Sequence, residues 1–355
     1  MPIPVQRDPE TTAAQLARWL STKLTAATSI SVSNLTPPQS TGFSNDTLLF
    51  DLACELDGEP AGGGRVVRIR PSGYAVFPTY DLAQQFRVMR ILGEHTSIPV
   101  PRVYWLEEDE SVLGAPFYLM ERIEGRIPPD NPPYHVAGWV TEIEPVERRS
   151  LWLDGLEVLS RIHQLDWQKL DLGFLSQSEL GPPGLDQQLR YYESYFAWAR
   201  RGKAHPIADA AFDWLKRNPP RHARLGLCWG DARIGNMIFQ DGKCRAVLDW
   251  EMATLGDPEQ DLAWWLFLDR HHSEGLGMPR LEGFPSHEET IERYEQWTGR
   301  RVENLKFYEI FAGFRFAVIM MRVAQMMIEY EVLPPDSPME TDNIVTGLLG
   351  NLLSD

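Results

Sequence analysis

Hydrophobic positions recur at two spacings in the first third of the chain, and each spacing predicts a different kind of element. After Asp8-Pro9, a typical helix start, Leu16, Trp19 and Leu20 fall on one helical stripe. Further along, apolar and polar residues alternate, which indicates strands. The predicted strands cover residues 30–35, 48–56, 66–70, 103–105 and 117–120, and a helix is expected over 81–95.

The rest of the chain is patterned mainly as helices. Its predicted helices cover residues 146–167, 186–200, 207–216, 286–297 and 307–327. The last of these is strongly apolar, but it contains Arg315 and Arg322 seven positions apart. We therefore expect a core helix that carries one polar face.

The segment around Asp231 carries the most informative polar motif. Asn236 follows Asp231 by five positions, which is the spacing of Asp and Asn in a kinase catalytic loop. Residues 237–248 read as strand, turn and strand, and this hairpin would fold Asp249 back beside Asn236. Each of these residues alone is more often a turn or helix-cap residue. Their ordered combination predicts a phosphotransferase site.

The chemistry of phosphoryl transfer explains these residue types. The acceptor hydroxyl must lie in line with the γ-phosphate, and the charge on the phosphate oxygens must be neutralised. Asp231 is expected to orient the hydroxyl and take its proton as the catalytic base. Mg²⁺ prefers hard oxygen ligands, so Asn236 and Asp249 are the predicted metal ligands.

The stretch from Trp229 to Leu268, including Gly256-Asp257-Pro258-Glu259, resembles the aminoglycoside phosphotransferase (APH) family. It is most similar to the branch that contains the kinase-like domain of acyl-CoA dehydrogenase fusion proteins. The resemblance implies ATP and Mg²⁺ as cofactors and an α+β, protein-kinase-like, two-lobed fold. A small N-terminal lobe with an antiparallel sheet would precede a larger, mainly helical C-terminal lobe. The expected parts are a nucleotide-binding lobe over 1–120, a hinge over 121–126 and a helical lobe over 127–355.

The resemblance also assigns a loop that covers the ATP phosphates. The polar loop between the first two predicted strands contains Gly42, Ser44 and Asn45, and its sequence is similar to the family's Gly-x-Ser-Asn segment. These three residues are therefore expected to contact the nucleotide. The next turn is expected to be bracketed by Asp57-Gly58 and by the glycines at 62–64.

Basic residues on the third predicted strand are candidates for the phosphate contact. Arg68 and Arg70 lie two positions apart and share a strand face, and alignment with the family's strand selects Arg68. Most kinases place lysine there, with a glutamate partner that falls at Gln85 in this chain. An arginine stays charged without a carboxylate, and Gln85 can accept a hydrogen bond from it. Backbone groups from Glu121 to Ile123 are expected to contact the adenine edge.

Composition narrows the class of protein. The 355 residues contain 34 Lys and Arg against 50 Asp and Glu, a net charge of −16, which argues against nucleic acid as a partner. Three widely spaced cysteines indicate neither a disulfide framework nor a zinc site. The N-terminus lacks an apolar signal core, and apolar stretches such as 262–268 are too short to span a bilayer. We expect a cytoplasmic enzyme without membrane association.

Several other polar residues are expected to have structural roles. His163 reads as a satisfied core histidine, Asp261 as a buttress of the catalytic loop and Trp229 as a packing residue. The acidic residues expected at the solvated surface are Asp269, Glu282 and Glu288.

The acceptor is expected to be a moderately apolar hydroxylated metabolite, such as a hydroxyacyl compound. Aromatic residues are frequent after Asp261, and some of them would line an acceptor cleft. Four other functions remain open: a nucleotide-binding pseudokinase without turnover, an aminoglycoside-modifying kinase, a protein kinase and a metal-dependent hydrolase. The last two are disfavoured by the short segment after Asp249, which leaves no room for an activation loop, and by the lack of a histidine cluster.

Overall fold

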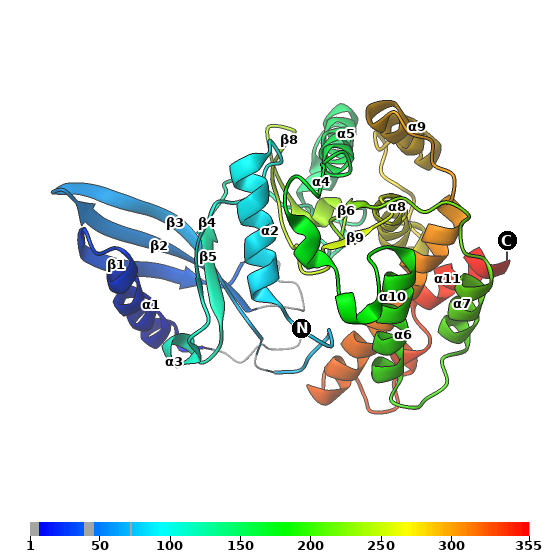
Figure 1. The fold of residues 1–355 in the computed structure, drawn as a ribbon, viewed down its shortest axis with the longest axis horizontal. Helices are drawn as coiled ribbons and strands as arrows, with labels where there is room; N and C mark the ends of the chain where they lie inside the picture. Colours follow the sequence, from blue (N-terminus) through cyan, green and yellow to red (C-terminus); the bar gives the residue numbers. More distant parts are fainter. Residues whose placement is uncertain (1–6, 39–45, 72, 355) are drawn as a thin grey trace.

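A computed structural model describes residues 7–38, 46–71 and 73–354 of the chain (Figure 1). Its first part contains an antiparallel sheet with the strand order β1-β2-β3-β5-β4. The strands are β1 (Ala27–Thr36), β2 (Asp46–Leu56), β3 (Glu59–Ile69), β4 (Val103–Glu107) and β5 (Phe117–Glu121). All five predicted strands are present, and each of them is longer than expected.

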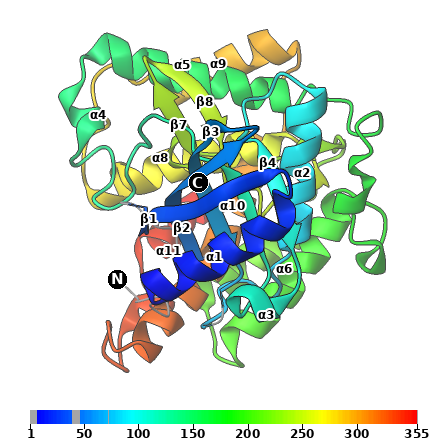
Figure 2. The ribbon, with the colours of Figure 1, turned by 90° about the vertical axis from the view of Figure 1, so that its left-hand side faces the viewer.

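Two helices pack on opposite faces of this sheet, because successive side chains along each strand point to opposite faces. Helix α1 (Pro9–Lys23) lies across the outer face, where its predicted stripe meets Val67 and Ile69 of β3 (Figure 2). Helix α2 (Leu82–His95) lies between the sheet and the rest of the molecule and packs on Val66 (Figure 1). Residue 68 has the parity of Val66, so Arg68 lies on the α2 face, toward the second lobe. A short helix that was not predicted, α3 (Glu110–Leu113), joins β4 to β5.

The turn between β2 and β3 is tighter than the sequence suggested. Asp57 and Gly58 alone form it, with φ of 53° and 83°, which is the geometry of a two-residue hairpin turn. The glycines at 62–64 were wrongly assigned to this turn and lie inside β3. Gly62 is required there because a Cβ atom would lie 2.1 Å from the carbonyl oxygen of Leu52 on the paired strand.

The second part of the molecule is mainly helical (Figure 1). Its helices are α4 (Trp139–Glu142), α5 (Pro145–Ile162), α6 (Leu185–Arg200), α7 (Pro206–Arg217), α8 (Glu259–His272), α9 (His287–Thr298), α10 (Leu305–Glu329) and α11 (Ile344–Ser354). Two small strand pairs lie among them: β6 (Gly226–Cys228) with β9 (Thr254–Gly256), and β7 (Met237–Gln240) with β8 (Lys243–Val247). Helices α4 and α11 were not predicted, and α5 ends five residues earlier than the predicted Trp167.

Helix α10 is the core of the helical lobe. An 18-residue stretch of it is apolar enough to cross a membrane, with a mean hydropathy of 1.4, but 78% of that stretch is buried inside the protein. It packs against α8, α7, α11 and α6. Arg315 and Arg322 are both buried, and each donates to backbone carbonyls of neighbouring segments. The predictions of a core helix and of a two-lobed, kinase-like α+β fold are confirmed.

The two lobes contact each other at several places, and two of these contacts involve the segments that follow β5 and β3. The chain leaves β5 at Glu121, and the backbone N–H of Arg126 then donates to Phe239 on β7 at 2.8 Å, within the predicted hinge. The second connection is the segment 73–80 between β3 and α2, which docks on the helical lobe. Its Ala75 carbonyl accepts from Arg322, and its Val76 carbonyl accepts from the Tyr195 hydroxyl at 2.6 Å. This second tie was not predicted.

Candidate active site

The loop after β6 is held by a buried carboxylate. Asp261, in the first turn of α8, accepts the backbone N–H groups of Trp229 at 2.6 Å and Gly230 at 3.0 Å. His163 binds the same carboxylate at 3.1 Å through Nε2, and its Nδ1 lies 2.7 Å from the Tyr294 hydroxyl. The expected roles of Asp261 as a buttress and of His163 as a satisfied core histidine agree with these contacts. The loop that follows therefore starts from a fixed position.

Asp231 comes next in the loop, and its carboxylate accepts hydrogen bonds from three side chains. Trp264 of α8 donates from Nε1 to Oδ1 at 2.7 Å, and Asn236 donates from Nδ2 to Oδ2 at 2.6 Å. Arg233 donates from Nε to both oxygens at 3.2 Å. The Asp231 side chain is 18% exposed, so it is held firmly and still reaches solvent. An acceptor hydroxyl could approach a carboxylate in this position.

Arg233 ties this loop to the entry of the helical lobe. Besides its contacts to Asp231, it donates from Nη2 to Asn236 Oδ1 at 3.1 Å and from Nη1 to Asp130 at 2.5 and 2.6 Å. Burial would lower the pKa of the Arg233 guanidinium, but Asp130 and Asp231 together raise it above its ordinary value. Burial would likewise raise the pKa of Asp130, and the charge of Arg233 holds it below the ordinary range instead.

Asp249 is brought beside Asn236 by the β7–β8 hairpin. The hairpin turns at Asp241 and Gly242, with φ of 53° and 70°, and the backbone N–H of Leu248 donates to the Asn236 carbonyl at 2.9 Å. Asp249 itself has a left-handed φ of 58°, an uncommon conformation for a residue with a Cβ atom. Trp229 stabilises this backbone conformation by donating from Nε1 to the carbonyl oxygens of residues 248 and 249.

Arg68 reaches this cluster from the other lobe. It donates from Nη2 to Asp249 Oδ1 at 3.0 Å, and its side chain is only 10% exposed. Burial would lower the pKa of Arg68, but Asp249 raises it above its ordinary value. Arg70 lies beyond the end of β3, where it pairs with Glu110 at the surface. The two arginines are therefore separated by the strand end, which the sequence analysis did not foresee.

Gln85 is buried near Arg68 but has a different partner from the one expected. Its Oε1 accepts from the Tyr118 hydroxyl at 3.4 Å, and Arg68 is paired with Asp249 instead. A hydrogen bond from Arg68 to Gln85, which the sequence allowed, is not present among the described residues. Asp249 carries a full negative charge and is therefore the stronger acceptor for a guanidinium.

The proposed metal ligands offer a donor set that suits Mg²⁺. Asn236 contributes an amide oxygen and Asp249 a carboxylate, and both are hard donors on adjacent backbone segments. Within the described ranges, no group of three or more His, Cys, Asp and Glu side chains is arranged to hold a metal ion. Mg²⁺ commonly takes one or two protein oxygens and completes its shell with phosphate and water, so two ligands suffice.

The other predicted nucleotide contacts are only partly placed. Gly42, Ser44 and Asn45 lie outside the described residues. At the hinge, the backbone N–H of Glu121 donates to Arg102 at 2.8 Å, within the sheet. The backbone N–H of Ile123 makes no hydrogen bond to any residue that the structure describes.

The expected solvation of one acidic residue was wrong. Asp269 of α8 is 1% exposed, whereas Glu282 and Glu288 are exposed as predicted. The Asp269 carboxylate accepts from Tyr134, His135, Arg280 and His287 at 2.6–3.1 Å. Burial would raise the pKa of Asp269, but these donors lower it far below the ordinary range. It joins the loop around 130–135 to the end of α8.

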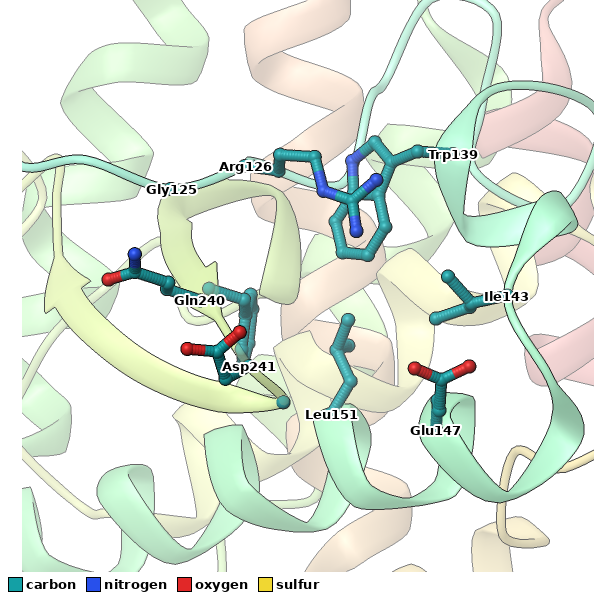
Figure 3. Close-up of a pocket in the computed structure, with 10 residues that line it drawn as sticks. Gly125, Arg126, Trp139, Ile143, Glu147, Leu151, Gln240 and Asp241 are labelled. Atoms are coloured by element: carbon teal, nitrogen blue, oxygen red, sulfur yellow. The ribbon is translucent and has the colours of Figure 1, made fainter.

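A separate pocket of about 320 Å³ lies beside the hinge (Figure 3). Its lining includes Leu151 and Phe239, and the Arg126 guanidinium lies over the Trp139 ring at 4.3 Å. Its lining contains neither Asp231 nor Asp249. The pocket is therefore distinct from the group of side chains around Asp231 and Asp249.

Three residues of the cluster were missed as functional candidates by the sequence analysis. Arg233 carried a detectable signal because it lies two positions after Asp231 in the same loop. Trp264 is one of the aromatic residues that follow Asp261, and Asp130 lies in a loop at the entry of the helical lobe. Their contacts to the loop bridge 33 and 103 residues of sequence, which a local motif does not reveal.

The geometry can be compared with known proteins. A model of the phosphotransferase enzyme family (APH) matches residues 38–297. The probable acyl-CoA dehydrogenase IBR3 of Arabidopsis thaliana is 33% identical over 275 residues, which are 72% of this chain and 32% of that protein. Acyl-CoA dehydrogenase family member 10 of Mus musculus is 33% identical over 272 residues, 73% of this chain and 24% of that protein. The chain thus spans a third or less of these relatives.

Solved structures share the fold. A putative aminoglycoside phosphotransferase from Ralstonia eutropha has a TM-score of 0.65 at 24% identity, covering 95% of this chain and 98% of that one. A thermostable mutant of aminoglycoside phosphotransferase APH(4)-Ia, solved as a ternary complex with ADP and hygromycin B, has a TM-score of 0.55 at 16% identity. That alignment covers 96% of this chain and 98% of the other. The resemblance inferred from the sequence motifs is confirmed.

Proposed function

The chain belongs to the phosphotransferase enzyme family (APH), and we propose that it transfers the γ-phosphoryl group of ATP to a hydroxyl of a small molecule. One observation carries the proposal. A single connected cluster holds a carboxylate, Asp231, within 2.6 Å of Asn236, whose backbone pairs with the residue before Asp249. This arrangement supports the proposal, because phosphoryl transfer requires a base and hard oxygen donors in one site.

Each group has a distinct task in this proposal. Asp231 orients the acceptor hydroxyl and takes its proton, and Arg233 and Trp264 keep its carboxylate in position. Asn236 and Asp249 would hold Mg²⁺, which when bound neutralises phosphate charge. Arg68 would give up part of its contact with Asp249 to meet phosphate oxygens.

The proposal also includes a nucleotide and a cellular compartment. ATP is proposed because relatives of this fold were crystallised with ADP or AMP-PNP. Gly42, Ser44 and Asn45 would cover its phosphates, and the backbone near Ile123 would meet its base. Cys54, Cys228 and Cys244 are buried free thiols, as expected for the proposed cytoplasmic enzyme.

We propose a moderately apolar hydroxy compound as the acceptor, such as a hydroxyacyl derivative. The two curated relatives are named as acyl-CoA dehydrogenases, and each contains a segment similar to this chain. This combination is compatible with an acyl acceptor. An aminoglycoside acceptor would need several free carboxylates near the base. Asp130, close to Asp231, is instead paired with Arg233.

A nucleotide-binding protein without turnover is a second candidate, and two specific contacts favour it. The proposed base is ion-paired with Arg233, and the proposed metal ligand is ion-paired with Arg68. The second of these pairs would have to rearrange in a working enzyme. The two candidates therefore differ in whether ADP is ever formed.

Release of ADP from Mg²⁺-ATP decides between these candidates. We expect slow ATP hydrolysis by the purified protein that is lost on chelation of Mg²⁺ and in Asp231→Asn. The matched control is Asp166→Asn, an exposed aspartate remote from the cluster. Nucleotide binding with no ADP above the Asp231→Asn background, with or without hydroxy compounds, would favour the second candidate.

A further inference from the structure

Helix α10 carries two buried arginines that have no task in the proposed reaction so far. Arg315 is 2% exposed and Arg322 is 5% exposed, and they lie seven positions apart, so they share one face of the helix. The C-terminal end of α10 lies beside the segment that joins β3 to α2 (Figure 1). One face of α10 thus reaches segments of both lobes.

Uncharged groups surround both guanidinium groups. Within the described ranges, every hydrogen bond from Arg315 and Arg322 goes to a carbonyl, amide or hydroxyl oxygen. Aromatic rings lie over both cations at 3.9–5.6 Å. These rings are Tyr192, Trp264 and Phe311 for Arg315, and Tyr74 and Trp198 for Arg322.

This arrangement is costly for stability. A buried charge loses its hydration, and neutral hydrogen-bond partners replace it only in part. Burial lowers the pKa of Arg322, whereas the buried Arg68 and Arg233 have pKa values raised by their carboxylate partners. Nη1 of Arg315 is also buried without a hydrogen-bond partner among the described residues. An apolar side chain would fill either position at a lower cost, so both arginines call for a role beyond packing.

Arg315 holds the residue that precedes the proposed base. Its Nη2 donates to the Gly230 carbonyl at 2.9 Å, and its Nε donates to the Tyr192 hydroxyl at 3.1 Å. Gly230 has a φ of 96°, a conformation that other residues rarely adopt. The Arg315 guanidinium also lies 4.7 Å from the Trp264 ring, which donates to Asp231. Arg315 therefore contacts both the backbone before Asp231 and a side chain that fixes its carboxylate.

Arg322 holds the segment that leads into α2. Its Nε and Nη2 donate to the Ala75 carbonyl at 3.2 and 2.8 Å, and its Nη1 donates to Gln325 at 2.7 Å. Tyr74 lies 4.2 Å from the guanidinium and donates to the same Gln325 oxygen at 3.0 Å. The segment ends at Asp81, the N-cap of α2. The start of α2 is therefore anchored to the helical lobe.

Helix α2 borders the nucleotide side of the proposed reaction centre. Its Gln85 accepts from Tyr118, which is paired with Arg68 in the sheet. The helix also packs on Val66, two residues before Arg68 on the same face of β3. Because Arg322 fixes where α2 begins, it fixes the surface against which Arg68 lies.

We propose that Arg315 and Arg322 are positioning residues that tie the two sides of the proposed reaction centre to one core helix. Arg315 sets the position of the loop that carries Asp231. Arg322 sets the position of α2 and thereby of Arg68. The assignment of kinetic effects rests on the proposed function: loss of Arg315 acts on turnover, and loss of Arg322 acts on ATP binding.

Methionine variants separate the two roles. Methionine fills much of the space of an arginine, and an apolar replacement for a buried charge is often neutral for stability. In Arg315→Met, we expect the kcat for Asp231-dependent ADP release from Mg²⁺-ATP to fall about 10- to 100-fold, with the KM for ATP within about threefold. In Arg322→Met, the KM for ATP should rise about tenfold, with kcat within about threefold.

Lysine variants and a control keep the test sharp. A lysine retains the charge and one donor for the carbonyl, so Arg315→Lys and Arg322→Lys should recover at least about threefold of the lost constant. They also cover the case in which a methionine variant does not fold. Arg217→Met is the matched control because Arg217 is exposed at the end of α7, and it should change neither constant.

Hydrogen exchange of backbone amides tests the same assignment without turnover. Arg315→Met should speed exchange in residues 229–236 more than in residues 81–95. Arg322→Met should show the opposite ranking. Each variant is compared with the wild type and with Arg217→Met in the absence of nucleotide.

The outcomes separate this inference from the proposed function. Kinetic constants and exchange rates like those of the wild type in both methionine variants would overturn the positioning roles, as would equal changes of both constants and both segments. Absence of Asp231-dependent ADP release from the wild type would overturn the proposed function. Hydrogen exchange alone would then decide whether the two arginines anchor the two segments.

Discussion

The two sides of the proposed reaction centre differ in how their key charged groups are held. On the acceptor side, Asp231 accepts from three donors that come from its own loop and from α8. On the nucleotide side, Arg68 donates a side-chain hydrogen bond to Asp249, and its Nε atom is buried without a hydrogen-bond partner among the described residues.

This difference indicates which half of the site is preformed. The carboxylate of Asp231 is fixed from three directions, so little ordering is needed when an acceptor arrives. Arg68 and Asp249 instead neutralise each other across the lobes, and Mg²⁺-ATP must replace this contact with contacts to metal and phosphate. We therefore expect substitutions on the acceptor side to act mainly on kcat and those on the nucleotide side mainly on ATP binding.

The largest effect is expected for Asp249→Ala, which removes the proposed carboxylate ligand of the metal and the partner of Arg68. A ligand present at a hundred times its Kd stabilises a folded protein by about 2.7 kcal/mol. We expect this stabilisation by Mg²⁺-ATP to vanish in the variant. Thermal unfolding with and without Mg²⁺-ATP measures it, with exposed Glu282→Ala as the control. Equal stabilisation of Asp249→Ala and the wild type by Mg²⁺-ATP would show that Asp249 is not a metal ligand.

The next effect is expected for Arg233→Ala, which frees Asp231 and Asn236 to move. We expect kcat to fall about 10- to 100-fold, with the KM for ATP within about threefold, because positioning of the base acts on the transition state. Steady-state ADP release gives both constants. Arg233→Lys should restore little, because a lysine cannot reproduce the planar fork that contacts three groups. A change in the KM for ATP alone would place Arg233 on the nucleotide side.

A smaller effect should distinguish the two arginines near the end of β3. Arg68→Ala should raise the KM for ATP about tenfold, since a charge-assisted contact to phosphate is lost. Arg70→Ala should change it less than twofold, because Arg70 pairs with Glu110 at the surface. Kinetic titration with ATP measures both. The reverse ranking would show that Arg68 only anchors Asp249.

The smallest effect concerns pH and the acceptor side. Burial lowers the pKa of His272 to about 4, although nearby Asp130 acts in the opposite direction. The unfolded chain takes up a proton on this imidazole near pH 6.5, and the folded protein does so only near pH 4, so stability contributed by this residue is lost as pH falls across that window. Between pH 7.5 and 5.5 the loss is about 1 kcal/mol.

Urea unfolding at these two pH values tests the effect of His272. His272→Phe should lose about 1 kcal/mol less than the wild type, whereas the variant of an exposed histidine, His95→Phe, should behave like the wild type. Identical pH dependence in all three proteins would mean that His272 is not kept neutral in the folded state.

The sequence predicted the local parts of the site better than the long-range ones. Asp231, Asn236 and Asp249 are joined by a short hairpin whose Asp-Gly turn is legible in the sequence. The partners Asp130 and Trp264 come from segments whose positions depend on how the helices pack. Alternation alone likewise placed Arg68 correctly on β3, but only the packed structure shows that Asp249 is its partner.

Burial was also hard to predict for charged residues. Asp269 was expected at the surface because acidic residues are seldom buried. Four donors from three different segments make its burial favourable, and the sequence of no single segment indicates that these donors meet at Asp269. The fold class was easier, since the strand-rich first third and the helical remainder were both patterned in the sequence.

The most direct test of the account is Asp231→Asn, measured for nucleotide binding and for turnover in the same preparation. The central claim is that Asp231 acts on the acceptor and that the nucleotide is held elsewhere. The account predicts that the Kd for Mg²⁺-ATP stays within about threefold while ADP release falls by about 10³-fold or more. Turnover close to that of the wild type, or loss of ATP binding together with activity, would contradict it.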